Sequence, residues 1–344
     1  MNIFDTTTLA TAVAYLKRPS FFLLDTFFAA QEIQDSETIT FDVLKGSERL
    51  APLVDPDIAA KVLENPGFQT FQISPAYVKD LRLFSPERAG KRVAGERVGG
   101  EFTRQNRLEL AINQALTDQL ANLKRREEYF ASQALINGKI TIKGTDSHRG
   151  KSINFGRDSA LNISLSGTNS WGSTGVNPLE MIEDWVSLVQ DKSGTAARTI
   201  VMDRKAWKLF RQSQLVVGLL EIRRGTTNSL SAEPVTFEEG EGQAQYVGSI
   251  ADMNFYVYAG KYSDEGGVSR GFLPDNTVLV VSREGLRGTR IYGAIEDISS
   301  GLQARDFYVK SWEEHDPSRH MMLMQSAPMI VPMRPNASLA ATVV

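Results

Sequence analysis

Residues 104–137 have the sequence RQNRLELAINQALTDQLANLKRREEYFASQALIN, which is the strongest single structural signal in the chain. Its apolar side chains recur every three, four or seven residues, which places them on one stripe of a helix. The stripe consists of Leu108, Ile112, Leu116, Leu120, Leu123, Phe130 and Ala134. At a rise of 1.5 Å per residue this helix would be about 50 Å long, and Gly138 supplies the left-handed residue that ends it. The spacing predicts a long spine helix over 104–137, with the charged run 124–128 on its solvated face.

Before this helix, residues 37–84 are predicted to be extended. The segment 38–43 alternates apolar and polar residues with a period of two, which is typical of a half-buried strand. Residues 68–73 and 81–84 also resemble strands, and Asn65-Pro66-Gly67 predicts a turn between such segments. A long strand pair with so little apolar content is not stable alone. We therefore expect this excursion to lie on another part of the protein or on a neighbour.

Three segments are candidates for contacts between molecules. The aromatic run 21–28 contains Phe21, Phe22 and Phe27, which either dock into the core of their own chain or onto a neighbouring subunit. Residues 79–107 carry eight Lys or Arg against four Asp or Glu, a local net charge of +4 in a chain of net charge −3. This run is either a solvated linker or an electrostatic contact with an acidic patch on a neighbour. Residues 225–244 hold four Glu and no Lys or Arg, which predicts an exposed loop.

The second half of the chain predicts an α/β subdomain that returns to the spine. After a boundary rich in Gly, Ser and Thr at 156–176, Asn177-Pro178 starts a helix, 199–202 forms a short buried strand, and Asp203 caps another helix. Further strands are expected at 246–258, 277–283, 289–296, 304–312 and 320–333. The last of these must rejoin the spine region, so that part of the fold is discontinuous in sequence.

The sequence contains no recognisable catalytic or cofactor-binding motif. The chain has no cysteine, which excludes disulfides and thiolate chemistry. Phosphate-binding, dinucleotide-binding, nucleophile-elbow and zinc-protease motifs are absent. His315 and His320 flank a turn, and their spacing fits no helical pair of metal ligands. We therefore predict no catalytic residue, no cofactor and no metal, and no apolar run approaches the about 20 residues needed to cross a bilayer.

The order of short motifs along the chain resembles the major capsid protein E family of lambda-type tailed phages. These motifs are Pro19 to Phe28, residues 37–44, Ser74-Pro75-Ala76-Tyr77-Val78-Lys79, Arg223-Arg224-Gly225, Phe272 to Thr277, Gly288 to Gly293, Trp312, Asp316-Pro317 and Gln325-Ser326-Ala327-Pro328. Each is short, but their order extends over about 300 residues of the chain. The resemblance implies an α+β fold of the Hong Kong 97 type.

This fold divides the chain into five predicted parts. They are an N-terminal arm (1–36), an extended E-loop (37–100), a peripheral domain (101–177) with the spine helix 104–137, an axial domain (178–290) and returning peripheral strands (291–344). The contacts that we predict between subunits are Phe21, Phe22, Phe27, Arg82, Phe84, Arg88, Arg92, Glu238 and Glu239.

The resemblance implies a structural protein and not an enzyme. Hexamers and pentamers of such a protein would form the icosahedral head of a tailed phage, assembled in the bacterial cytoplasm around double-stranded DNA that it contacts without sequence specificity. The implied partners are further copies of the chain, a scaffolding protein, the portal and a decoration protein, with no membrane. Two alternatives are a nanocompartment shell of the same fold and a soluble α/β enzyme with an unrecognised site.

Overall fold

The computed structural model describes most of the chain. The described residues are 19–44, 67–85, 102–142, 150–213, 244–250, 252–264, 266–301, 303–316 and 318–344, with residues 9, 11–13, 16, 56, 87, 91 and 216. The fold is of the mixed α+β class, as predicted.

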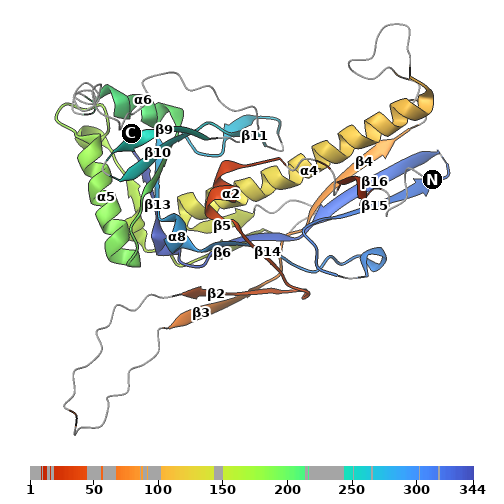
Figure 1. Ribbon diagram of the computed structural model, residues 1–344, viewed down its shortest axis with the longest axis horizontal. Helices are drawn as coiled ribbons and strands as arrows, with labels where there is room; N and C mark the ends of the chain where they lie inside the picture. Colours follow the sequence, from red (N-terminus) through yellow and green to blue (C-terminus); the bar gives the residue numbers. More distant parts are fainter. Residues whose placement is uncertain are drawn as a thin grey trace.

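One long helix, α4 (Arg104–Asn137), runs along the body, as Figure 1 shows. Its bounds are those predicted. The Thr103 side chain accepts a hydrogen bond from the Asn106 backbone N–H, and Gly138 ends the helix with φ = 62°. The predicted stripe faces inward, because its residues from Ile112 to Ala134 are buried. The Leu9 and Val13 side chains, from the predicted arm, are buried in the same apolar cluster.

A three-stranded antiparallel sheet packs beside α4. Its order is β15 (Tyr308–Glu314), β16 (Arg319–Ser326) and β4 (Val78–Phe84). Met322 and Met324 of β16 and Phe84 of β4 meet Ile112 and Leu116 of α4 in one apolar cluster. The strand that we predicted at 81–84 as part of the E-loop therefore lies in this sheet, beside the spine helix.

A second, six-stranded sheet forms the predicted α/β subdomain. Its order is β7 (Asn162–Ser164), β18 (Ser338–Thr342), β13 (Thr277–Val281), β8 (Thr199–Met202), β10 (Met253–Tyr258) and β9 (Ala244–Ile250). The helices α5 (Pro178–Ser193) and α6 (Arg204–Gln212) begin at Asn177 and Asp203, whose side chains cap them as predicted. Both contribute to the apolar cluster of this sheet. β18 belongs to the segment predicted to return to the peripheral domain, yet it pairs with β13.

Four smaller sheets complete the described part of the fold. They are β1 (Ala30–Ile33) with β14 (Gly288–Tyr292) and β17 (Pro328–Pro332), β2 (Ile39–Leu44) with β3 (Phe68–Ile73), β5 (Lys139–Ile142) with β6 (Lys151–Asn154), and β11 (Lys261–Ser263) with β12 (Ser269–Gly271). The short helices are α2 (Phe22–Phe27), α8 (Arg283–Leu286), η1 (Ser159–Leu161), η2 (Gly167–Asn169), η4 (Ile298–Ser300) and η5 (Pro335–Ala337). β2 and β3 project from the lower edge of the body (Figure 1).

The prediction that residues 124–128 form a solvated face holds for Arg126, which is exposed, but is wrong for Lys124, Glu127 and Glu128. Lys124, Glu127 and Glu128 are buried, with relative exposures of 6%, 1% and 0%. They lie on a second face of α4, beside the apolar stripe, and their polar atoms meet α2, β10 and β14. Helical periodicity identified one buried face, whereas the neighbours that bury the second face come from remote parts of the sequence.

Candidate assembly surfaces

The predicted arm residues lie within their own chain. Phe21 and Phe27 are buried, and Phe22 is half-buried, with its ring 5.1 Å from that of Tyr256. Arg290 of β14 donates to the backbone oxygen of Phe28 and forms an ion pair with Asp25. These contacts fix α2 against the body. That Phe21, Phe22 and Phe27 also contact a neighbouring subunit stays a prediction.

Glu128 joins α2 to the spine helix. Its carboxylate accepts hydrogen bonds from the backbone N–H groups of Leu23 and Leu24, at 3.0 and 2.7 Å, and from the Tyr258 hydroxyl at 2.6 Å. The residue at the N-cap of α2, Phe21, provides no side-chain cap. A carboxylate from α4 therefore takes the place of the missing cap and satisfies the first N–H groups of the short helix.

Burial raises the pKa of Glu128 to about 7, against the lowering effect of these three hydrogen bonds. Burial also raises the pKa of the Tyr258 hydroxyl, which keeps that group protonated and able to donate. Beside them, Lys124 forms an ion pair with Glu127 at 2.8 Å, and the Tyr292 hydroxyl donates to Glu127 at 3.0 Å. Lys124, Glu127 and Glu128 of α4 therefore contact α2, β10 and β14, three segments that lie far from α4 in the sequence.

We expect Glu128 to lower the stability of the fold as the pH rises from about 4.5 to about 7. In this range the folded chain keeps a proton that the unfolded chain, with its carboxyl pKa near 4.5, has released. The free energy of unfolding of the wild type, relative to Glu128→Gln, should therefore fall by about 1–3 kcal/mol across this range and then level off. Urea unfolding of both proteins at a series of pH values measures this difference in the free energy of unfolding. A difference that does not change with pH would contradict the raised pKa, and Asp118→Asn, on an exposed position of α4, is the control.

The β2–β3 pair is attached to the body through one face. Ile39, Phe41 and Val43 of β2 are buried, and the Phe41 ring stacks on that of Phe71 in β3 at 5.4 Å. Phe68 of β3 is 62% exposed. The alternation predicted for 38–43 is therefore confirmed, and this pair carries an exposed aromatic side chain away from the core.

The sheet beside α4 has a second, open face. Leu81 pairs with Leu323, and Met321 pairs with both Leu83 and Trp312, which puts all five side chains on the face away from the helix. Leu81, Leu83 and Trp312 are 52%, 40% and 41% exposed. We call these five residues the outer apolar face. An exposed group of large apolar side chains of this kind is typical of a surface that another molecule covers.

Two predicted contact residues of β4 lie on the opposite face of this sheet. Phe84 is buried against α4, and Arg82 donates to Asp80 of its own chain at 3.1 Å. The sequence predicted the strand, but the side chains of β4 that point away from α4 are those of Leu81 and Leu83. Contacts of Arg82 and Phe84 with a neighbour stay predictions. Arg88, Arg92, Glu238 and Glu239 lie outside the described residues.

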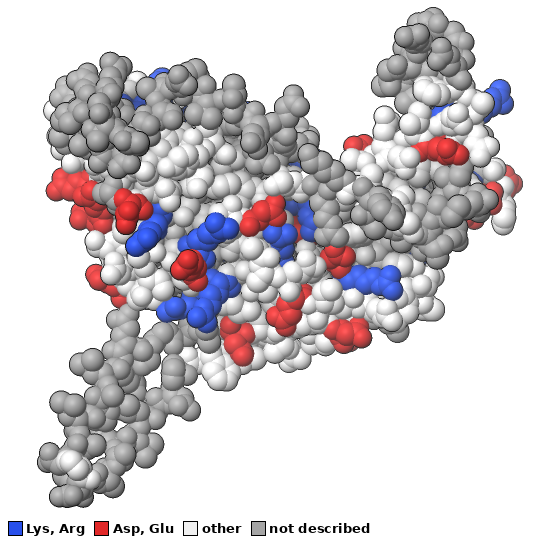
Figure 2. Space-filling model, in the orientation of Figure 1, with Lys and Arg blue, Asp and Glu red and all other residues white. Residues whose placement is uncertain are grey.

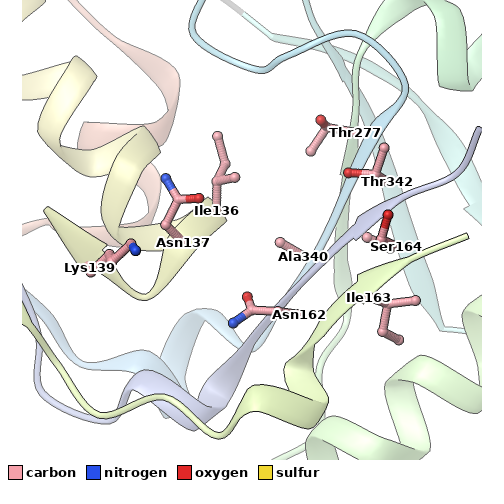
Figure 3. A pocket seen from close by; sticks show the side chains of 10 residues that line it. Ile136, Asn137, Lys139, Asn162, Ile163, Ser164, Thr277, Ala340 and Thr342 are labelled. Carbon is pink, nitrogen blue, oxygen red and sulfur yellow. The ribbon is translucent and has the colours of Figure 1, made fainter. Parts of the chain in front are cut away.

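Charged side chains of both signs are mixed across the face of the body in Figure 2. A shallow cavity of about 300 Å³ lies between the end of α4 and strands β7 and β18 (Figure 3). Lys139 is the one ionisable side chain among the residues that line it, so this cavity offers no acid–base pair. Within the described ranges no group of His, Asp and Glu could hold a metal ion. In the same ranges, α4 and the shorter helices are too polar or too short to span a bilayer.

The sequence reasoning missed Glu128 and Arg157. Glu128 lies three and seven positions before the buried Ala131 and Leu135, a helical spacing that signals a charge on an inward face. Arg157 comes from a loop, and its guanidinium donates to the Leu135 backbone oxygen at the end of α4 at 2.5 Å. Local sequence carries no comparable signal for that contact.

The model of the family described as phage major capsid protein E matches residues 5–343. The chain belongs to this family. The major capsid protein of Escherichia phage lambda is 30% identical to it over 310 residues, which cover 89% of each chain. That of Escherichia phage N15 is 29% identical, again over 89% of each.

The solved structures agree with this family. A protein of a prophage of E. coli CFT073, described as its capsid protein, superposes with a TM-score of 0.74 at 19% identity and covers 99% of each chain. The capsid of Ralstonia phage GP4 gives a TM-score of 0.54 at 12% identity, over 95% of this chain and 91% of that one. The fold is therefore the Hong Kong 97-type capsid fold. As a member of the capsid protein E family, the protein is a structural component of a tailed-phage head.

Proposed function

We propose that copies of this chain form hexamers and pentamers that close into an icosahedral shell around double-stranded DNA. In this shell the β2–β3 excursion of one subunit lies over the spine helix of its neighbour, and the outer apolar face is covered by another subunit. The outer apolar face is the observation that carries the proposal, because water-exposed Leu81, Leu83 and Trp312 would be unfavourable in a subunit that stayed alone.

The shell needs only modest contacts between each pair of subunits. A subunit held by several neighbours at once gains from the high effective concentration of each further contact. Closed symmetric rings also satisfy every copy of a contact without leaving a free end. Expansion of the shell during maturation would proceed by rigid-body rotation of subunits, with α4 and the excursion bending.

The remaining partners are proposed by analogy with the family. A scaffolding protein would guide assembly, a portal would occupy one vertex, and a decoration protein could stabilise the outside, with assembly in the bacterial cytoplasm. The DNA would be enclosed without sequence-specific contact, which suits the mixed surface charge and the net charge of −3.

The direct experiment is to express the chain with and without its phage neighbours and to measure particle size by light scattering and negative-stain microscopy. Closed shells tens of nanometres wide are the expected result. A compact monomer under every condition, even with the scaffolding protein supplied, would overturn the proposal.

Removing apolar area from the outer face should impair assembly without unfolding the subunit. In Leu81→Ser/Trp312→Ser, we expect the yield of shells to fall about tenfold or more, because each subunit contact loses about 1–3 kcal/mol and the loss is repeated around the shell. Circular dichroism and urea unfolding check that the subunit is intact. Val344→Ser removes a 55%-exposed side chain at the C-terminus and is the matched control. Shells at the wild-type yield would exclude this face as a subunit contact.

A further inference from the structure

A basic groove lies between α4, the start of α6 and the β11–β12 hairpin. It has a volume of about 1220 Å³. Among the described residues that line it, five are cationic and one is acidic: Arg125, Arg126, Arg204, Lys261, Arg270 and Asp264. A chain of net charge −3 thus concentrates positive charge in one recess, which raises the local potential for an anionic partner.

The groove is held in shape by contacts among its own walls. Arg126 lies over the Tyr129 ring, 5.9 Å from its centroid, and that ring meets Tyr262 of β11 edge-on at 5.1 Å. Arg270 forms an ion pair with Asp264 at 2.7 Å, and Arg125 donates to Asn122 at 2.7 Å. Arginines held in this way lose little side-chain entropy on binding. These contacts therefore preorganise the lining side chains of the groove for binding.

The same chain carries an acidic edge of opposite charge. Residues 19–44 contain five Asp or Glu and no Lys or Arg. Three of these acids, Glu32, Asp35 and Glu37, are exposed on or just after β1, which is an edge strand of its sheet with every residue exposed. Ile33, within β1, is 53% exposed. We call residues 32–37 the acidic edge.

The two surfaces lie on opposite sides of the molecule. In Figure 1, β14, which pairs with β1, and the neighbouring β2 occupy the lower side of the body, whereas β11 lies at its upper side. A head-to-tail contact between copies needs two different, complementary surfaces on one chain, and it forms a ring where the rotation between copies closes. We propose that the acidic edge of one subunit docks in the basic groove of the next copy. This inference rests on the proposed function, because it names the contact that joins neighbours in a capsomer.

A protein occupant fits the groove better than nucleic acid. Its lining includes Tyr129, Tyr262 and Ile142 beside the cations. A phosphate backbone offers no apolar side chain to this part of the wall, whereas the acidic edge offers the exposed Ile33 in addition to its carboxylates. Binding of a fluorescent 20-base-pair DNA duplex to the groove, lost in the groove variant below, would instead assign the groove to nucleic acid and overturn the docking proposal.

Charge reversal tests the contact. Arg126→Glu/Lys261→Glu and, separately, Glu32→Lys/Glu37→Lys should each lower the yield of shells about tenfold, because like charges then face each other at every ring contact. The chain that carries all four changes should assemble to within about twofold of the wild type, since each pair is restored with reversed sign. Lys208→Glu, an exposed cation of α6 outside the groove, is the control. Two single-surface variants that assemble normally, or a combined variant that is not rescued, would refute the docking.

Chemical cross-linking tests the docking contact separately from the formation of the shell. The chain has no cysteine, so Glu37→Cys/Lys261→Cys gives thiols at these two positions alone. In shells, a bismaleimide should join neighbours into covalent rings that denaturing gels resolve, and the single-cysteine chains should give at most dimers. Shells without such a ladder would refute the docking while leaving the shell function intact. If the wild type forms no shell, the proposed function fails, and cross-linked oligomers in concentrated subunit solution still decide the docking.

Discussion

Glu128→Ala is expected to destabilise the folded subunit by about 2–4 kcal/mol. The change leaves the backbone N–H groups of Leu23 and Leu24 and the Tyr258 hydroxyl without their buried acceptor. It also opens a cavity at a fully buried site. The loss should separate the N-terminal arm from the spine helix first, because α2 has no side-chain cap of its own.

Two measurements check this expectation. Urea unfolding of the unassembled subunit gives the loss in free energy, and hydrogen exchange at Leu23 and Leu24 reports whether α2 opens before the rest. Asp118→Ala, an exposed acid of the same helix, should change the stability by less than about 0.5 kcal/mol. Unchanged protection of α2 in Glu128→Ala would show that the carboxylate does not hold the arm.

Arg157→Ala is also expected to lower the free energy of unfolding by about 2–4 kcal/mol, because it removes hydrogen bonds at the C-terminal end of α4. The last carbonyl groups of a helix have no partner within it. Here the Arg157 guanidinium donates to the backbone oxygens of Leu135 and Ile136 and to the Asn162 side chain. Burial lowers its pKa to about 10, which still leaves the group charged at neutral pH. Its removal would leave the buried Leu135 oxygen without this donor, together with the part-buried Ile136 oxygen and Asn162 side chain.

Thermal and urea unfolding measure the loss, with Arg211→Ala on an exposed position of α6 as the control. Arg157→Lys should recover only part of the stability, because one ammonium group cannot donate to three separate acceptors in the directions that the planar guanidinium does. Equal stability of Arg157→Ala and the wild type would mean that solvent satisfies the end of α4.

The elements that the sequence predicted correctly depend on local signals. The apolar stripe of α4 and the left-handed Gly138 set the bounds of that helix, and Asn177 and Asp203 start α5 and α6 through hydrogen bonds to N–H groups two or three residues ahead. The alternation in 38–43 likewise predicted the buried face of β2. The order of the family motifs then predicted the capsid fold and role, because it extends along most of the chain.

Other features were decided only by the tertiary structure. In the sequence Glu128 resembles one more charge on a solvated helix face, but Leu23, 105 positions before it, and Tyr258, 130 positions after it, surround its carboxylate. The outward face of β4 depends on which side α4 packs against, so Leu81 and Leu83 became its exposed residues and Phe84 did not. Local patterns were enough to predict the helices and their caps, because these depend on neighbours within a few residues, and the order of motifs along the chain was enough to predict the family. Burial of charge, the exposed sheet face and the opposition of groove and acidic edge depend on contacts between remote segments, which local patterns do not encode.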